Sequence, residues 1–288
     1  MTDYTWKISY GDQSSASGDV GTDNITVGGL TIKNQAIELA KQMSQQFIEG
    51  AGDGLLGLAW DSINTVSPAP VQTPVQNMIT QQDIPPSAEL FTAYLGSWRD
   101  ANDPDKGESF YTFGYIDQPT IDNSGEQISW TPVDNSQGFW MISSESATVN
   151  GQTINQPGNT AIMDTGTTLA LVSDTTCQAI YNAIPGAIYD QASQGYIFPD
   201  NLTADQLPIV TIAIGGKQFT VQKEDLGFGK LPRFKISRKA SMVLIVRTAE
   251  AKQGFVYGGI QSRGTMSFDI LGDTMLKSIY AVSASSYS

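Results

Sequence analysis

The string AIMDTGTTLALV, residues 161–172, contains the residues of this sequence that are best suited to chemistry. An apolar run leads into Asp164, and a Thr-Gly-Thr turn sequence follows it. Gly166 permits a tight turn, while Thr167 and backbone N–H groups can donate hydrogen bonds to a carboxylate. The string therefore predicts a strand whose end presents the Asp164 carboxyl as a general acid or base. An aspartate in an ordinary turn is the alternative interpretation.

The composition excludes several other kinds of catalytic site. The 288 residues include no histidine and a single cysteine, Cys177. Ser-His-Asp and Cys-His nucleophilic systems need a histidine, and zinc sites are usually built from histidines or pairs of cysteines. We therefore expect no metal site and no disulfide within the chain. Cys177 lies in a helical pattern, where we expect a small buried thiol.

The charge balance bears on the partners of the chain. The sequence has 29 acidic and 16 basic side chains, which give a formal charge of −13. Such a charge repels nucleic acid phosphates and anionic membranes, so we expect neither as a partner. The sequence has no run of 18 apolar residues, and its first residues lack the basic and apolar regions of a secretion signal. We expect a soluble chain without a signal peptide of its own.

Most segments show the composition of β-strands. β-branched and aromatic residues, often alternating with polar ones, fill five segments: 4–10, 108–116, 138–149, 207–214 and 217–221. The strings GGLT at 28–31 and NGQT at 150–153 predict hairpin turns. Short helices are predicted at 74–82 and at 173–184, the second capped by Ser173 or Asp174. The sequence therefore predicts a mainly β fold.

Two further patterns give context to Asp164. An apolar-apolar-Gly pattern occurs at 53–60 (DGLLGLAW) and again at 268–275 (FDILGDTM), which suggests two related halves. Residues 8–20, ISYGDQSSASGDV, predict a hairpin with a tip of small polar residues, suited to a mobile flap in which Tyr10 covers a substrate.

Residues 230–253 differ in charge from the rest of the chain. They hold seven of the sixteen basic residues and one acidic residue, so the other 264 residues carry −19. We expect this segment to be an insertion translated from a retained intron, because the codons of Gly229-Lys230 and of Val282-Ser283 can both contain the donor sequence GTAAG. A basic amphipathic anchor and a solvated basic loop are the alternatives.

Seven strings together make the sequence resemble the pepsin-like family of aspartic endopeptidases (peptidase A1), particularly its secreted fungal members. The strings are ISYGD with SGDVGTD, DGLLGLAW, SFYTFGYID, GFWMI, AIMDTGTTL, YGGIQSRG and FDILGDTML. The resemblance covers nearly the whole chain outside 230–253 and the final residues. It implies a bilobal, nearly all-β fold with a cleft between the lobes, to which each lobe contributes one aspartate from a D-T/S-G loop.

The resemblance also implies a mechanism. Two carboxylates about 3 Å apart cannot both ionise, so they share a proton. The ionised carboxylate takes a proton from a water that attacks the scissile carbonyl, and the protonated one donates to the developing oxyanion. The family is extracellular, works in acid, needs no cofactor and cleaves peptides or proteins; we expect a monomer.

Individual roles follow from the matching motifs. Asp164 corresponds to the catalytic aspartate of the second lobe, and Gly166 and Thr167 correspond to residues that contact the substrate backbone. Tyr10, Gly11 and Asp12 match the flap. Leu55 lies where the family lines an apolar specificity pocket.

The sequence departs from the family at its first catalytic loop. D-T-G occurs once, and symmetry places the partner of Asp164 about 30 residues before Met1. We therefore expect 1–123 to be an incomplete N-terminal lobe that includes the flap, and 124–288 to be the C-terminal lobe, itself ending early after LKSIYAV. With no like-charged carboxylate expected beside Asp164, we predict that this chain alone has no peptidase activity.

Two other functions are left open by the residues. A pseudo-peptidase would bind peptides in the cleft without cutting them. A carboxylate glycosidase or a lectin-like β protein would need a second acid 5 to 10 Å away and aromatic sugar platforms. Asn24 and Asn201 lie in N-x-T sequences and are candidate glycosylation sites if the protein is secreted.

Overall fold

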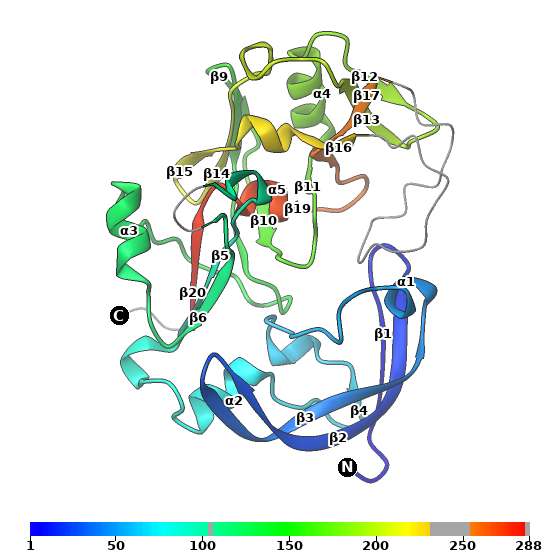
Figure 1. The fold of residues 1–288 in the computed structure, drawn as a ribbon, viewed down its shortest axis with the longest axis vertical. Helices are drawn as coiled ribbons and strands as arrows, with labels where there is room; N and C mark the ends of the chain where they lie inside the picture. Colours follow the sequence, from blue (N-terminus) through cyan, green and yellow to red (C-terminus); the bar gives the residue numbers. More distant parts are fainter. Residues whose placement is uncertain (103–105, 231–253, 286–288) are drawn as a thin grey trace.

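The structure is a computed structural model that describes residues 1–102, 106–230 and 254–285. The basic insertion expected at 230–253 lies outside the described residues except for residue 230, so the intron hypothesis stays a prediction. Figure 1 shows two groups of elements, one formed by the first part of the chain and one by the second, with strands β5, β6 and β20 between them.

The first group is built on a four-stranded antiparallel sheet in the order β3-β2-β1-β4. Its strands are β1 (Thr5–Ser9), β2 (Ser15–Val27), β3 (Leu30–Met43) and β4 (Val66–Ser67). The turn between β2 and β3 places Gly28 and Gly29 at φ of 57° and 83°, which a side chain at either position would disfavour. The hairpin predicted at GGLT is thus confirmed, with Val27 opposite Leu30.

Short helices cover parts of this sheet. They are α1 (Gln45–Ile48), α2 (Pro74–Thr80) and the 3₁₀ turns Asp61–Ile63 and Pro86–Ala88. Helix α2 begins at Pro74, and the side chain of Thr73, the residue before it, caps the helix by accepting a hydrogen bond from Gln76 N. Met78 of α2 packs with Ile32 of β3 in a small core, and both side chains are fully buried. The helix predicted from Pro74 is confirmed.

A three-stranded sheet places the last strand of the described chain beside two strands from its first half. It has the order β20-β5-β6, with β5 (Leu90–Tyr94), β6 (Phe110–Phe113) and β20 (Tyr280–Ala284). The β5–β6 connection carries a 3₁₀ turn, η3 (Trp98–Asp100), and β6 is followed by helix α3 (Gln118–Ser124). The Tyr280 hydroxyl donates to Thr92 Oγ1 of β5 and accepts from Asp117 N at the start of α3, so β20 is tied to both of these elements.

The second group contains three sheets. Their orders are β18-β11-β19-β10-β7, β12-β13-β17-β16 and β15-β14-β8-β9. The strands are β7 (Met141–Ser143), β8 (Ser146–Val149), β9 (Gln152–Asn155), β10 (Thr160–Met163), β11 (Ala170–Val172), β12 (Ile188–Asp190), β13 (Gly195–Pro199), β14 (Val210–Ile214), β15 (Lys217–Thr220), β16 (Gly227–Lys230), β17 (Phe255–Gly258), β18 (Ile260–Ser262) and β19 (Asp269–Leu271).

The helices of this group are α4 (Asp174–Asn182), α5 (Asp273–Leu276) and the 3₁₀ turns Ala204–Gln206 and η5 (Lys223–Leu226). Ser173 caps α4 by accepting a hydrogen bond from Thr176 N at 3.3 Å. The buried face of α4 packs into the largest core of the molecule, where Cys177 and Ile180 are fully buried. The prediction that Cys177 is a buried thiol is confirmed.

The predicted elements agree with the structure in kind and differ in detail. The NGQT turn at 150–153 joins β8 to β9, with Asn150 and Gly151 at positive φ. The single strand expected over 138–149 is divided into β7 and β8 by two non-strand residues, 144 and 145. Helices α1, α3 and α5 were not predicted: α1 and α5 span four residues each, and α3 has Ile121 as its single aliphatic residue, so none of them shows a helical period.

Candidate active site

Asp164 lies at the end of β10, on a loop whose hydrogen bonds fix its carboxylate. One carboxylate oxygen, Oδ1, accepts from Gly166 N at 2.8 Å, and the other, Oδ2, accepts from Thr167 Oγ1 at 2.6 Å. The backbone closes the same turn, because Thr167 N donates to Asp164 O at 3.3 Å. The predicted strand and turn are confirmed. Gly166 does not adopt positive φ; its requirement is space, since a Cβ there would lie 3.1 Å from Asp164 Oδ1.

The second apolar-apolar-Gly segment packs directly against this loop. Strand β19 pairs in parallel with β10, and Leu271 O accepts from Asp164 N at 3.1 Å. The next residue, Gly272, packs against the loop so closely that a Cβ would lie 2.1 Å from Thr167 O. Asp273 N then donates to Thr167 O at 2.8 Å. These contacts explain why the pattern ends in glycine: only a residue without a side chain lets α5 approach the Asp164 loop.

Asp273, the first residue of α5, is a second carboxyl at this site. Burial and, to a smaller extent, the charge of Asp164 raise its pKa to about 7, and the ammonium of Lys277 acts in the opposite direction. The expectation that Asp164 has no like-charged neighbour is therefore wrong. The sequence already placed an acidic residue directly after the second apolar-apolar-Gly pattern, and that position was the signal we did not use. No hydrogen bond joins the two carboxyls in the described part of the chain.

The flap predicted at residues 8–20 is a hairpin of β1 and β2. Ser9 lies opposite Ser15, and Tyr10 N donates to Ser14 O at 2.9 Å across the tip. Asp12 Oδ1 accepts from Ser14 N at 2.8 Å, and Gly11 has open space around its Cα. The hairpin extends from the first group of elements toward the second (Figure 1).

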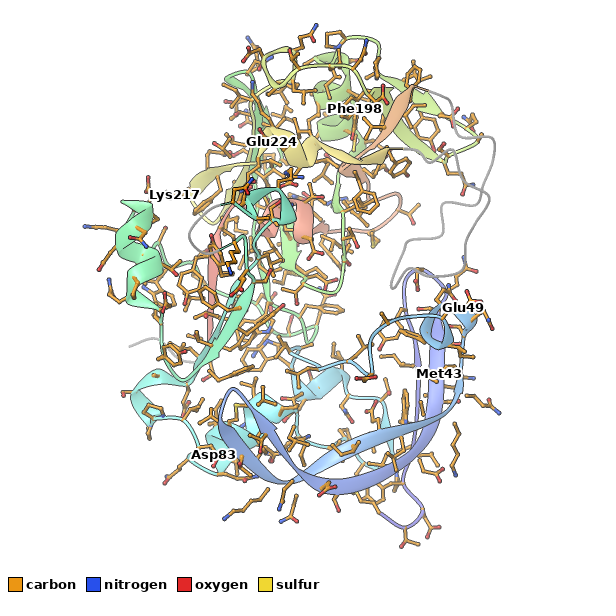
Figure 2. The ribbon with its side chains drawn as sticks, in the orientation of Figure 1. Met43, Glu49, Asp83, Phe198, Lys217 and Glu224 are labelled. Carbon is orange, nitrogen blue, oxygen red and sulfur yellow. The ribbon has the colours of Figure 1, made fainter. Side chains whose placement is uncertain are left out.

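Tyr10 is partly exposed and packs edge-on against Phe47 of α1, with 5.7 Å between the ring centroids. Partial burial raises the pKa of the Tyr10 phenol, and the charges of Glu38 and Asp12 raise it further. The ring therefore stays neutral and able to donate a hydrogen bond. Figure 2 shows the labelled neighbours of this region, Met43 at the end of β3 and Glu49 just after α1.

Leu55 belongs to the first copy of the repeat, which is not built like the second. In the second copy Leu271 pairs with Met163 of β10 and Ala170 of β11, and it is fully buried. Residues 51–57 are all exposed and belong to no strand, and Leu55 is 63% exposed. The structure brings Gly166 and Thr167 to Asp164, and it shows no hydrogen bond between that loop and Tyr10, Gly11, Asp12 or Leu55 within the described ranges.

The described residues also bear on metals and membranes. No group of three or more His, Cys, Asp or Glu side chains there is arranged to hold a metal ion. No helix in those residues is both long and apolar enough to span a bilayer.

Comparisons with known proteins place the chain in a family. A sequence profile described as Eukaryotic aspartyl protease matches residues 1–285. Aspergillopepsin-1 of Aspergillus oryzae is 39% identical over 279 residues, covering 96% of this chain and 62% of the relative. Penicillopepsin-1 of Penicillium janthinellum is 38% identical over 283 residues, covering 98% of this chain and 76% of the relative.

The fold agrees with these relatives. The crystal structure of an aspartic proteinase from Irpex lacteus superposes with a TM-score of 0.71 at 23% identity, covering 99% of this chain and 79% of that one. The chain spans about 62% of the length of several of the relatives it matches. The mainly β architecture, the Asp164 loop and the match over nearly the whole sequence lead to one conclusion: the chain belongs to the eukaryotic aspartyl protease family.

Proposed function

We propose that this chain carries one half of an aspartic endopeptidase site, with Asp164 as a catalytic carboxyl. The observation that carries the proposal is the loop geometry: both Asp164 oxygens accept hydrogen bonds from the D-T-G-T turn, at 2.8 and 2.6 Å. Those donors hold the carboxylate in one orientation, as a group that must activate a water requires. Gly166 and Thr167 contact the substrate backbone, and Tyr10, Gly11 and Asp12 cover it as the flap.

The complete reaction needs two carboxylates in contact. One takes a proton from the attacking water while the other donates a proton to the carbonyl oxygen of the scissile peptide bond, so acid and base roles are divided between them. D-T-G occurs once in this sequence. We therefore propose that the chain by itself does not hydrolyse peptides, and that a second aspartate on a matching loop completes the site.

The exposed segment 51–57 supports this division. In the second half, the equivalent strand β19 lies between β10, which leads into Asp164, and β11. In the first half the corresponding residues pair with no strand, and Leu55 and Leu56 are exposed. A strand of the β10 kind laid along this segment would bring its own terminal aspartate to the position that symmetry assigns to the partner of Asp164. Leu55 would then line an apolar specificity pocket.

We propose the domain boundaries 1–123 and 124–288, peptide or protein substrates with bulky apolar residues, a monomeric state and an extracellular location. The family relationship supports the substrate class and the location, and the hairpin and the D-T-G-T loop support the division into a flap-bearing part and a catalytic part. Asn24 and Asn201 are both exposed, which is compatible with glycosylation on secretion.

A fluorogenic peptide with a Phe-Phe centre tests the proposal at pH 3 to 5, with three proteins compared: the chain, Asp164→Ala and Asp273→Asn. We expect no cleavage above background by any of them. Cleavage by the chain that is lost only in Asp164→Ala would overturn the proposed inactivity. Cleavage that is lost in both variants would show in addition that Asp273 acts as the second carboxyl.

Peptide binding without cleavage is a second candidate function, favoured by the single D-T-G together with an intact flap hairpin. Fluorescence anisotropy of the same peptide, labelled and uncleaved, measures it directly. Binding that is weakened by Tyr10→Ala supports a peptide-binding role, whereas equal anisotropy with and without the chain contradicts it.

A further inference from the structure

Asp225, in the 3₁₀ turn η5, is a buried carboxylate shared by two cations from distant parts of the chain. Its side chain is 7% exposed. Arg99 Nη2 donates to Asp225 Oδ1 at 2.5 Å, and Lys277 Nζ donates to the same oxygen at 2.6 Å. A buried carboxylate is costly unless it is paired, and the contacts with Arg99 and Lys277 offset that cost.

The two cations lie on different elements, Arg99 on the β5–β6 connection and Lys277 at the end of α5. Arg99 lies in η3, on the connection between β5 and β6, 126 positions from Asp225. In its described part, residues 97–100 form a turn in which Ser97 O accepts from Asp100 N at 2.9 Å, and a Cβ on Gly107 would lie 1.9 Å from the same Ser97 oxygen. Arg99 therefore lies within a hydrogen-bonded turn where it meets Asp225.

Lys277 lies immediately after α5 and so next to the candidate site. Its N–H donates to Asp273 O at 2.9 Å, and Gln222 Nε2 donates to Lys277 O, also at 2.9 Å. The backbone N–H of Asp273 in turn donates a hydrogen bond to Thr167 O in the Asp164 loop. An unbroken series of contacts therefore runs from Arg99 through Asp225 and Lys277 to Asp273 and the Asp164 loop.

We propose that Lys277 is a positioning residue whose ammonium group is held close to Asp273 by Asp225 and Arg99. The contact between Arg99 of η3 and Asp225 then determines how much positive charge lies at the Asp164 site. The charges within the cluster are Arg99⁺, Lys277⁺ and Asp225⁻, which leave one net positive charge close to α5. The other charged groups on η5 are Lys223, which donates to Ala204 O, and Glu224, which is exposed and labelled in Figure 2.

The sign of the effect follows from the groups that face Asp273. Asp164 opposes its ionisation and Lys277 favours it, and among the described residues these are the two charged side chains that act on its carboxyl. Removing the Lys277 charge should therefore make Asp273 hold its proton to higher pH. Removing Arg99 takes one positive charge from a more distant position and should shift Asp273 in the same direction by less.

Carbon-13 NMR of aspartate carboxyls in the full chain measures this without any turnover, with the Asp273 signal assigned from Asp273→Asn. The inference deepens the proposed site, but its test is independent of peptidase activity, so failure of either one is distinguishable. We expect Lys277→Met to raise the Asp273 midpoint by up to about one pH unit. We expect Arg99→Gln to raise it by less, and the charge-conserving Lys277→Arg to restore a value close to that of the parent chain.

Lys217→Met is the matched control, since Lys217, which is labelled in Figure 2, pairs with Glu126 on the surface. It should leave the Asp273 midpoint unchanged. An unchanged midpoint in Lys277→Met, or an equal shift in Lys217→Met, would overturn the proposal. A shift in Lys277→Met with none in Arg99→Gln would overturn the coupling to the β5–β6 connection. The proton–nitrogen spectrum of each variant shows whether it is folded.

Discussion

Replacing Asp273 by asparagine should stabilise the protein at neutral pH and leave its stability unchanged in acid. The folded-state pKa of Asp273 is raised from 3.8 to about 7, chiefly by burial and then by the charge of Asp164. Between these values the folded chain binds more protons than the unfolded chain, so the free energy of unfolding falls as the pH rises from about 4 to about 7. Asparagine has a similar shape and no charge to bury.

The magnitude follows from the two pKa values. A difference of about 3 units at 1.36 kcal/mol per unit corresponds to about 4 kcal/mol. The carboxyl is only partly buried, and solvent screening reduces the expected effect to about 1–2 kcal/mol at pH 8. Below pH 4 the parent carboxyl is protonated in both states, so the two proteins should be equally stable there.

Urea unfolding of parent and variant at pH 4 and pH 8 is the assay. Asp134→Asn is a control of opposite sign, because the backbone N–H of Ser136 lowers the pKa of that exposed carboxyl. The Asp134→Asn variant should therefore be less stable than the parent at pH 8, and this difference should be smaller at pH 4. A parent chain that is as stable as Asp273→Asn at pH 8, or an Asp273→Asn variant that loses stability there, would refute the reasoning.

Three other predictions concern the loop and the core. Gly272→Ala should cost about 3 kcal/mol in urea unfolding, because its Cβ would lie 2.1 Å from Thr167 O, whereas Gly216→Ala, with open space, should cost much less; equal costs would contradict the close packing. Thr167→Val removes the 2.6 Å hydrogen bond to Asp164 Oδ2 and should cost about 1–2 kcal/mol by the same measurement, and a neutral effect would show that the bond does not hold the carboxylate. The Cys177 thiol, fully buried and with its pKa raised to about 12 by burial, should react with a disulfide reagent only on unfolding; rapid reaction of the native chain would contradict its burial.

The sequence was most informative where local chemistry determines local structure. Gly28-Gly29 and Asn150-Gly151 require left-handed backbone, so their turns were predictable. Asp164 was predictable because a carboxylate followed by Thr-Gly-Thr has its hydrogen-bond donors within three residues. Ser173 as a helix cap followed from the same kind of short-range hydrogen bond.

Features that depend on contacts between distant segments were not predictable in this way. Asp273 acts on Asp164 only because β19 lies beside β10, more than a hundred residues away in the sequence. Arg99 meets Asp225 across 126 positions, and nothing local to either residue indicates the pairing. The exposure of residues 51–57 likewise depends on which strands lie beside them, which the apolar pattern alone does not specify.

The central claim is that two aspartates on matching loops are needed for proteolysis and that this chain supplies one of them. Digestion of acid-denatured haemoglobin at pH 3 to 4, by the chain and by Asp164→Ala at equal concentration, tests it most directly. We predict the same background release of peptides from both proteins. Pepstatin-sensitive digestion by the chain that disappears in Asp164→Ala would contradict the claim.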